Sequence, residues 1–204
     1  MAQLEILRDE VRHPLNRSGL RMVAGPGGAL TRGTMLAGSL ASAAVGGTLI
    51  IAHVGTLAAA EALFGVHMAV QGVLQLLAVH ASKAPVAVRW TLSAGALAAL
   101  LLGVVLLHGW TDTVALLGVW TGCGWLLRGF TMAVSATAAS VSHVFVYDEV
   151  LNAVIVSAGL FMTAFPFLSL GQLTDVGGCV LMATGGVEAF AAARRHPRTL
   201  RAIG

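Results

Sequence analysis

Charged residues are scarce in this sequence, and their scarcity excludes a water-soluble fold. Only 10% of the 204 residues are Asp, Glu, Lys or Arg, whereas a soluble domain usually carries about 25%. Hydrophobic residues make up 57% of the chain, and the mean hydropathy is +0.85. Because a water-facing surface cannot be built from so few charges, we expect the bilayer to be the solvent of most of the chain.

Cysteine is also scarce, which argues against a disulfide framework and against a zinc site. Cys123 and Cys179 both fall inside apolar stretches, without a Cys-x-x-Cys motif or a zinc-type Cys/His spacing. No two histidines lie three or four residues apart on one helix face. The sequence therefore predicts no metal site and no cofactor, and two reduced thiols that pack as small apolar side chains.

Six apolar stretches are long enough, or nearly so, to cross roughly 30 Å of hydrocarbon. They lack period-two alternation, which favours helices over strands. We therefore expect an all-α membrane protein with six transmembrane helices. The stretches run approximately over residues 34–53, 57–79, 90–107, 113–134, 150–168 and 173–193.

Lys and Arg are absent from the short connections after the first, third and fifth stretches. They collect instead before the first stretch, in the loop that holds Lys83 and Arg89, and after the last stretch. Since basic residues stay on the cytoplasmic side, we expect both termini in the cytoplasm. Basic clusters beside membrane spans contact anionic lipid, so no nucleic-acid partner is expected.

The segments outside the six-helix domain, residues 34–194, are rich in charge. Residues 1–33 are expected to form a short cytoplasmic amphipathic helix that ends at Pro14, followed by a flexible linker at 25–28. This segment either lies on the membrane surface or is a loosely ordered tail, and both alternatives remain open. Residues 195–204 are expected to form a basic cytoplasmic tail.

The sequence repeats itself three times. Shifting it by 57 and then by 56 residues superposes three sets of glycines. Each repeat holds two stretches joined by a short outer turn, which predicts three tandem helical hairpins at about 34–84, 88–140 and 147–197. The glycine sets are Gly46, Gly103 and Gly159; Gly65, Gly122 and Gly178; and Gly72, Gly129 and Gly185.

Small residues spaced four apart form ridges that let helix backbones approach closely in lipid. We interpret these ridges as helix-packing surfaces. The third repeat has Leu151 and Ile155 at the corresponding positions, so its first helix is expected to pack differently. The ridges are Gly38, Ser42 and Gly46 in the first stretch, Gly95, Ala99 and Gly103 in the third, and Gly118 and Gly122 in the fourth.

Three tandem hairpins with glycines near the middle of each second helix resemble the HdeD-like family of bacterial membrane proteins. The resemblance covers about residues 34–194, and it implies a bacterial cytoplasmic membrane location and a role in acid or envelope stress, without an established reaction. Family repeats often place Trp-Pro at the outer turn and a polar residue before the second-helix glycine. The equivalents here are His53, Trp110 and Pro166, then Gln71-Gly72, Arg128-Gly129 and Thr184-Gly185.

Polar residues inside the apolar stretches are the candidate functional site. Gln71 and Gln75 lie one turn apart, and their repeat equivalents include Arg128 in the fourth stretch and Thr184 and Glu188 in the sixth. An unpaired charge in lipid costs at least about 2.5–3.5 kcal/mol. We therefore expect Arg128 to meet Glu188, with the two glutamines adding hydrogen bonds. A polar constriction on a solute or proton path, an ion pair that fixes helix register, and snorkelling to the headgroups remain open.

Three histidines have different expected surroundings. His53 and His108 lie near the outer turns, where an imidazole that titrates near about pH 6.5 would register an acidic exterior. The alternative is that both are simply hydrated at the interface. His67 lies deeper, and we expect it to be a neutral, packed imidazole.

Three classes of function follow. The first is a non-catalytic membrane scaffold or partner-binding protein, surrounded by lipid and forming a homo-oligomer or binding a membrane protein, with residues 1–33 as a candidate contact. The second is a channel or carrier for protons or a small solute, constricted at Arg128 and Glu188. The third, an enzyme, is disfavoured because no nucleophile, acid–base pair or metal constellation is visible.

Overall fold

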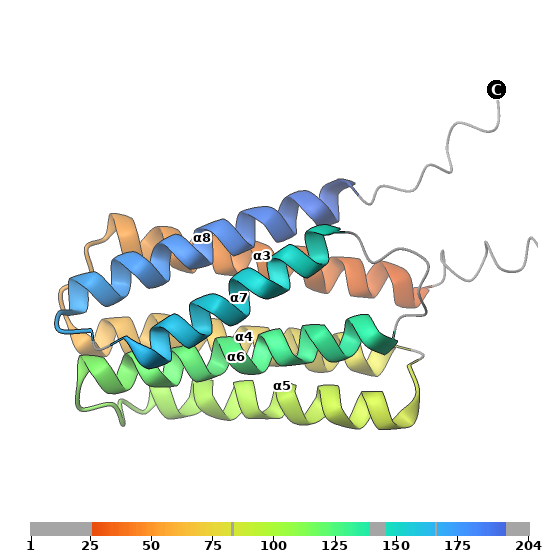
Figure 1. Cartoon of the computed structure of the whole chain (residues 1–204), viewed down its shortest axis with the longest axis horizontal. Coiled ribbons are helices and arrows are strands. Elements are labelled where there is room, and N and C mark those ends of the chain that lie inside the picture. Colours follow the sequence, from red (N-terminus) through yellow and green to blue (C-terminus); the bar gives the residue numbers. More distant parts are fainter. Residues whose placement is uncertain (1–25, 83, 139–145, 166, 195–204) are drawn as a thin grey trace, which may run out of the picture.

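The computed structural model describes residues 26–82, 84–138, 146–165 and 167–194. Within these ranges the regular secondary structure is all α-helical, which confirms the all-α part of the expected fold, and the helices lie side by side in one bundle (Figure 1). The expected surface helix and basic tail fall outside the described residues. The helices are α3 (Pro26–Ile51), α4 (Leu57–Ala81), α5 (Val86–Leu107), α6 (Val114–Ala138), α7 (Val146–Ala164) and α8 (Leu170–Arg194).

Helix α3 begins earlier than the sequence pattern indicates. The linker expected at 25–28 is wrong for most of its length, because residues from Pro26 onward are helical. Proline is well suited to the first position of a helix, since its fixed φ is helical and its missing N–H would have no partner there. The sequence pattern places the glycines that follow Pro26 in a linker, yet they continue the helix.

The expected turns after the first and third apolar stretches lie where the sequence places them. Helix α3 ends two residues before His53, whose φ of +42° reverses the chain, and α5 ends just before His108 and Gly109. Among the described residues, three helices are long and apolar enough to cross a membrane: α3 through Gly33–Ile51, α4 and α5. The apolar part of α7, Glu149–Ala164, is shorter.

The repeated glycines form three equivalent helix–helix contacts. A Cβ added at Gly103 in α5 would lie 2.8 Å from the carbonyl oxygen of Gly65 in α4. A Cβ at Gly122 in α6 would lie 2.7 Å from the carbonyl oxygen of Gly159 in α7. These distances leave no room for a side chain, so the glycines are needed because two backbones touch. The expected packing role of the small residues is present at each of these contacts.

The third equivalent contact joins the two ends of the domain. A Cβ at Gly46 in α3 would lie 2.7 Å from the carbonyl oxygen of Gly178 in α8. Each close contact therefore pairs the second helix of one repeat with the first helix of the next repeat, and the last repeat returns to the first. Helix α8 runs beside α3 along most of its length (Figure 1). The three hairpins are closed into a ring.

Contacts within the hairpins are looser than contacts between them. Helix α3 packs on α4, and α5 on α6, but α7 makes little contact with α8. In the third repeat Leu151 and Ile155 are buried in the core instead of forming a small-residue ridge. Helix α7 thus packs differently from the first helices of the other two repeats, as the sequence analysis expects.

The interior between α4, α6 and α8 is filled unequally by the three repeats. Phe64 and Met68 of α4 are buried and reach across the interior. A Cβ at Gly177 in α8 would lie 2.7 Å from the Phe64 ring, and a Cβ at Gly124 in α6 would lie 2.5 Å from the Met68 sulfur. Large side chains from the first repeat therefore occupy the space that glycines leave in the other two.

Adjacent glycines of α8 provide a matched test of the ring closure. A Cβ at Gly185 would lie 2.6 Å from the carbonyl oxygen of Ser39, whereas Gly186 has nothing within 4 Å. We expect Gly185→Ala to lower the free energy of unfolding by about 1–3 kcal/mol through overpacking. Gly186→Ala is expected to leave it unchanged or raise it by up to about 1 kcal/mol. Unfolding in detergent micelles measures both, and equal stability of the two variants would contradict the proposed closure.

Candidate functional site

An ion pair links two repeats in the interior. The guanidinium of Arg128 on α6 donates a hydrogen bond to Oε1 of Glu188 on α8. The two side chains are 21% and 14% exposed, so water competes only weakly for them. The structure thus brings together the two charges that the sequence analysis expected to meet. Pairing offsets part of the cost of placing each charge among apolar helices.

Gln71 does not join this ion pair. Its Nε2 donates to the carbonyl oxygen of Gly38 and to Oγ of Ser42, each at 2.9 Å, and thereby ties α4 to α3. The expectation that Gln71 supports the ion pair is therefore wrong. Gly38 has no side chain, which leaves its carbonyl open to the amide. Gln75, one turn further along α4, is half-buried.

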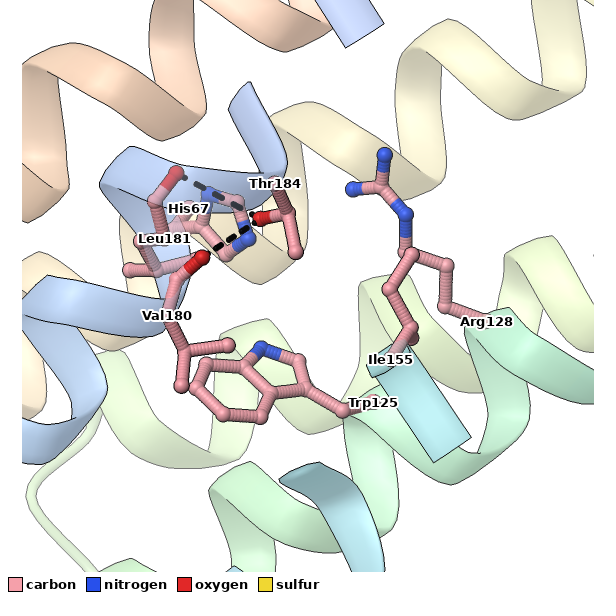
Figure 2. Close-up of a pocket in the computed structure, with 7 residues that line it drawn as sticks. All are labelled: His67, Trp125, Arg128, Ile155, Val180, Leu181 and Thr184. Carbon is pink, nitrogen blue, oxygen red and sulfur yellow. Dashed lines mark hydrogen bonds between the residues drawn. The ribbon is translucent and has the colours of Figure 1, made fainter. Parts of the chain in front are cut away.

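A small cavity lies beside the ion pair, with a volume of about 10 Å³. This is room for about one water molecule. Figure 2 shows its polar side chains facing a common space, with the Trp125 indole nitrogen directed toward His67 and Thr184. The residues that line it come from four helices and are His67, Trp125, Arg128, Ile155, Val180, Leu181 and Thr184.

Two polar residues of the cavity wall are nearly closed off from solvent. His67 is 1% exposed, and its Nδ1 has no hydrogen-bond partner within the part of the chain that the structure describes. Thr184 is 7% exposed, and its hydroxyl donates to the carbonyl oxygen of Val180 at 2.8 Å, one turn back in α8. The sequence pointed to Thr184 but not to a role for His67. Comparison of the repeats could have identified His67. Its equivalents are Gly124 and Val180, so a polar imidazole occupies a position that is small or apolar in the other two repeats.

Glu61 is a second buried group that the sequence analysis did not single out. It lies in the first turns of α4 and is 5% exposed, and none of the described residues forms a hydrogen bond with its Oε1. Its other carboxyl oxygen would be 3.5 Å from a Cβ added at Gly109, in the turn after α5. Glu61 therefore lies at the end of the interior next to the turn after α5, whereas Arg128 and Glu188 lie in the C-terminal halves of their helices.

The two candidate pH-sensing histidines lie at helix ends. His53 and His108 are both exposed. Nδ1 of His53 is 3.2 Å from the carbonyl oxygen of Ile51, and Nδ1 of His108 is 2.9 Å from that of Val104. The His108 ring also lies 5.6 Å from the Trp110 ring, between centroids. Each imidazole thus contacts a backbone carbonyl close to it in the sequence. Both are open to solvent, and the pH-sensing role stays a prediction.

The described residues contain no group of three or more His, Cys, Asp or Glu side chains that would hold a metal ion. Cys123 is half-buried and Cys179 is exposed, and both are free thiols. Equivalent positions in two repeats thus carry cysteines with different exposure, since α6 and α8 are covered differently by their neighbours.

Comparisons with known proteins return no relative. No protein-family model matches the chain, and no curated protein or solved structure matches it significantly. The site must therefore be interpreted from its own geometry.

A double-mutant cycle measures the ion pair. We expect Arg128→Ala and Glu188→Ala each to lower stability, because each leaves the partner charge buried without a counter-charge. The double variant should lose less than the sum of the two, with a coupling energy of about 0.5–3 kcal/mol. Unfolding in detergent micelles provides the three values. Losses that simply add would show that the two charges contribute independently.

Proposed function

We propose that this chain is a non-catalytic, multi-pass protein of a bacterial cytoplasmic membrane that acts as a scaffold or partner-binding protein. The proposal rests on the interior of the bundle, which is filled by packed side chains. The space beside the most polar residues holds about one water molecule, so an organic substrate or solute has no room there. Binding of a partner, in contrast, uses the outer surface, which this packing holds rigid.

Six membrane spans follow from the equivalence of the repeats. Helices α4 and α5 are long and apolar enough to cross a bilayer, and α6 and α8 are the repeat equivalents of α4. Each of α6 and α8 has 25 residues, which exceeds the roughly 20 that a span needs. Their lower hydropathy arises from polar residues such as Arg128 and Glu188, whose charges neutralise each other.

Large apolar side chains on the outside of the bundle support a lipid environment. Leu40 on α3, Leu101 on α5 and Leu160 on α7 are 63%, 64% and 60% exposed. A soluble protein would not leave so many long apolar side chains in water. Lipid tails solvate such a surface without cost.

A stress-related role rests on the resemblance to HdeD-like proteins. The glycine contacts support this part of the proposal only indirectly, since they show that the repeat is a structural unit. His53 and His108 are exposed on the side opposite the basic loop, where an acidic exterior would reach them.

A channel or carrier for protons is the second candidate, and the polar groups of the interior favour it. His67, Thr184 and the Arg128–Glu188 pair lie together, although bilayer interiors usually exclude such groups. A proton needs no cavity larger than a water molecule, so the small volume does not argue against it.

The topology is tested by labelling single cysteines in a variant without Cys123 and Cys179. We expect Gly55→Cys, in the turn after α3, to react with a membrane-impermeant maleimide in intact cells. Ser82→Cys, in the turn after α4, should react only after the membrane is opened, because positive charge keeps this loop inside. The opposite pattern would reverse the proposed orientation, and equal labelling of both sites in intact cells would exclude it.

The function is tested by purification and by flux. We expect the full chain to co-purify with a specific membrane partner, and removal of residues 2–25 to weaken this while leaving α3 intact. Vesicles that contain the purified protein should show no proton flux above protein-free vesicles. A pH-dependent flux that Arg128→Ala abolishes would replace the scaffold with the channel.

A further inference from the structure

We propose that the cavity beside Arg128 binds a single ordered water molecule that joins His67 to the Arg128–Glu188 ion pair. The first support is the size of the space. At about 10 Å³ the cavity admits a water molecule and excludes larger ligands. A cavity of this size stays dry when its walls are apolar, so the chemistry of the walls decides the occupant.

The walls provide several hydrogen-bonding groups in the proportion that one water requires. Trp125 and Arg128 have only donors, which a water oxygen accepts. Thr184 already uses its hydroxyl proton on α8, so its oxygen remains as an acceptor. A neutral His67 presents its unprotonated nitrogen as a second acceptor. Two donors and two acceptors match the four hydrogen bonds of water.

The unpartnered nitrogen of His67 is the second, independent support. Its side chain lines the cavity at 1% exposure, and Nδ1 has no partner among the described residues. Leaving a buried polar group without a hydrogen bond costs about 1–3 kcal/mol. A bound water lowers this cost, because a neutral imidazole chooses its tautomer according to the partner that is present.

An ion is a poorer occupant than water. Among the described residues, Arg128 is the one charged side chain that lines the cavity, and its partner Glu188 already neutralises it. A neutral molecule therefore meets no uncompensated charge, whereas an anion or cation would compete with the ion pair. The water would contact side chains of all three repeats, since His67, Trp125 and Thr184 come from α4, α6 and α8 (Figure 2).

The test uses the indole proton of Trp125 as a probe of bound water. NMR of the full chain in micelles resolves the four tryptophan indole groups, and single Trp→Phe variants assign them. We expect the Trp125 proton to show a cross-peak to water with opposite signs in NOE and ROE experiments, which marks a long-lived bound molecule. Absence of this cross-peak would overturn the proposal.

Two pairs of α8 variants separate bound water from proton exchange with a neighbouring hydroxyl. Val180→Ile fills the cavity and keeps Thr184 and His67, whereas Val187→Ile adds the same group on an exposed face. We expect only the first to abolish the cross-peak, and its persistence there would show that no water was bound.

The second pair keeps the test valid if the filled cavity prevents folding. Thr184→Val removes the acceptor from the cavity, and Thr174→Val removes a similar hydroxyl elsewhere, since Thr174 is 2% exposed and also donates to a carbonyl of α8. We expect the cross-peak to weaken in the first variant and to persist in the second. An unchanged intensity in Thr184→Val would contradict the site.

Discussion

The direct approach of helix backbones at glycine is the constraint on which the rest of this structure depends. In lipid, apolar side chains gain little from leaving their surroundings, so helices associate through close packing and polar contacts. Gly65 against Gly103, Gly122 against Gly159, and Gly178 against Gly46 provide that packing three times with the same geometry. These contacts determine which helices lie side by side around the interior.

The ring so formed brings the polar residues of different repeats into one interior. Arg128 and Glu188 are sixty positions apart in the chain, yet they meet because their helices α6 and α8 both face the centre. The repeats have diverged at these positions, so one supplies the cation and another the anion. A symmetric interior would have placed like charges together, which is unfavourable in a medium of low polarity.

Much of this fold could be predicted from the sequence, because the glycine sets and the six apolar stretches are periodic features of one chain. The pairing of the helices could not, since a glycine marks a contact face but not the helix that meets it. Arg128 and Glu188 were predictable partners because few charges were available. The partner of Gln71 could not be predicted, since it is the backbone carbonyl of Gly38. The cavity at His67 could not be predicted either, because it arises from a volume mismatch among diverged repeats.

The closure of α8 on α3 has a consequence for the biogenesis of the protein. During synthesis α3 leaves the ribosome before α8, and the surface around Gly46 lacks the α8 backbone that it contacts in the ring until α8 has been made. The other two close contacts form between helices that are neighbours in sequence and emerge together. Of the six described helices, the earliest to be made thus completes its contacts last, and the ring closes only when the third repeat arrives.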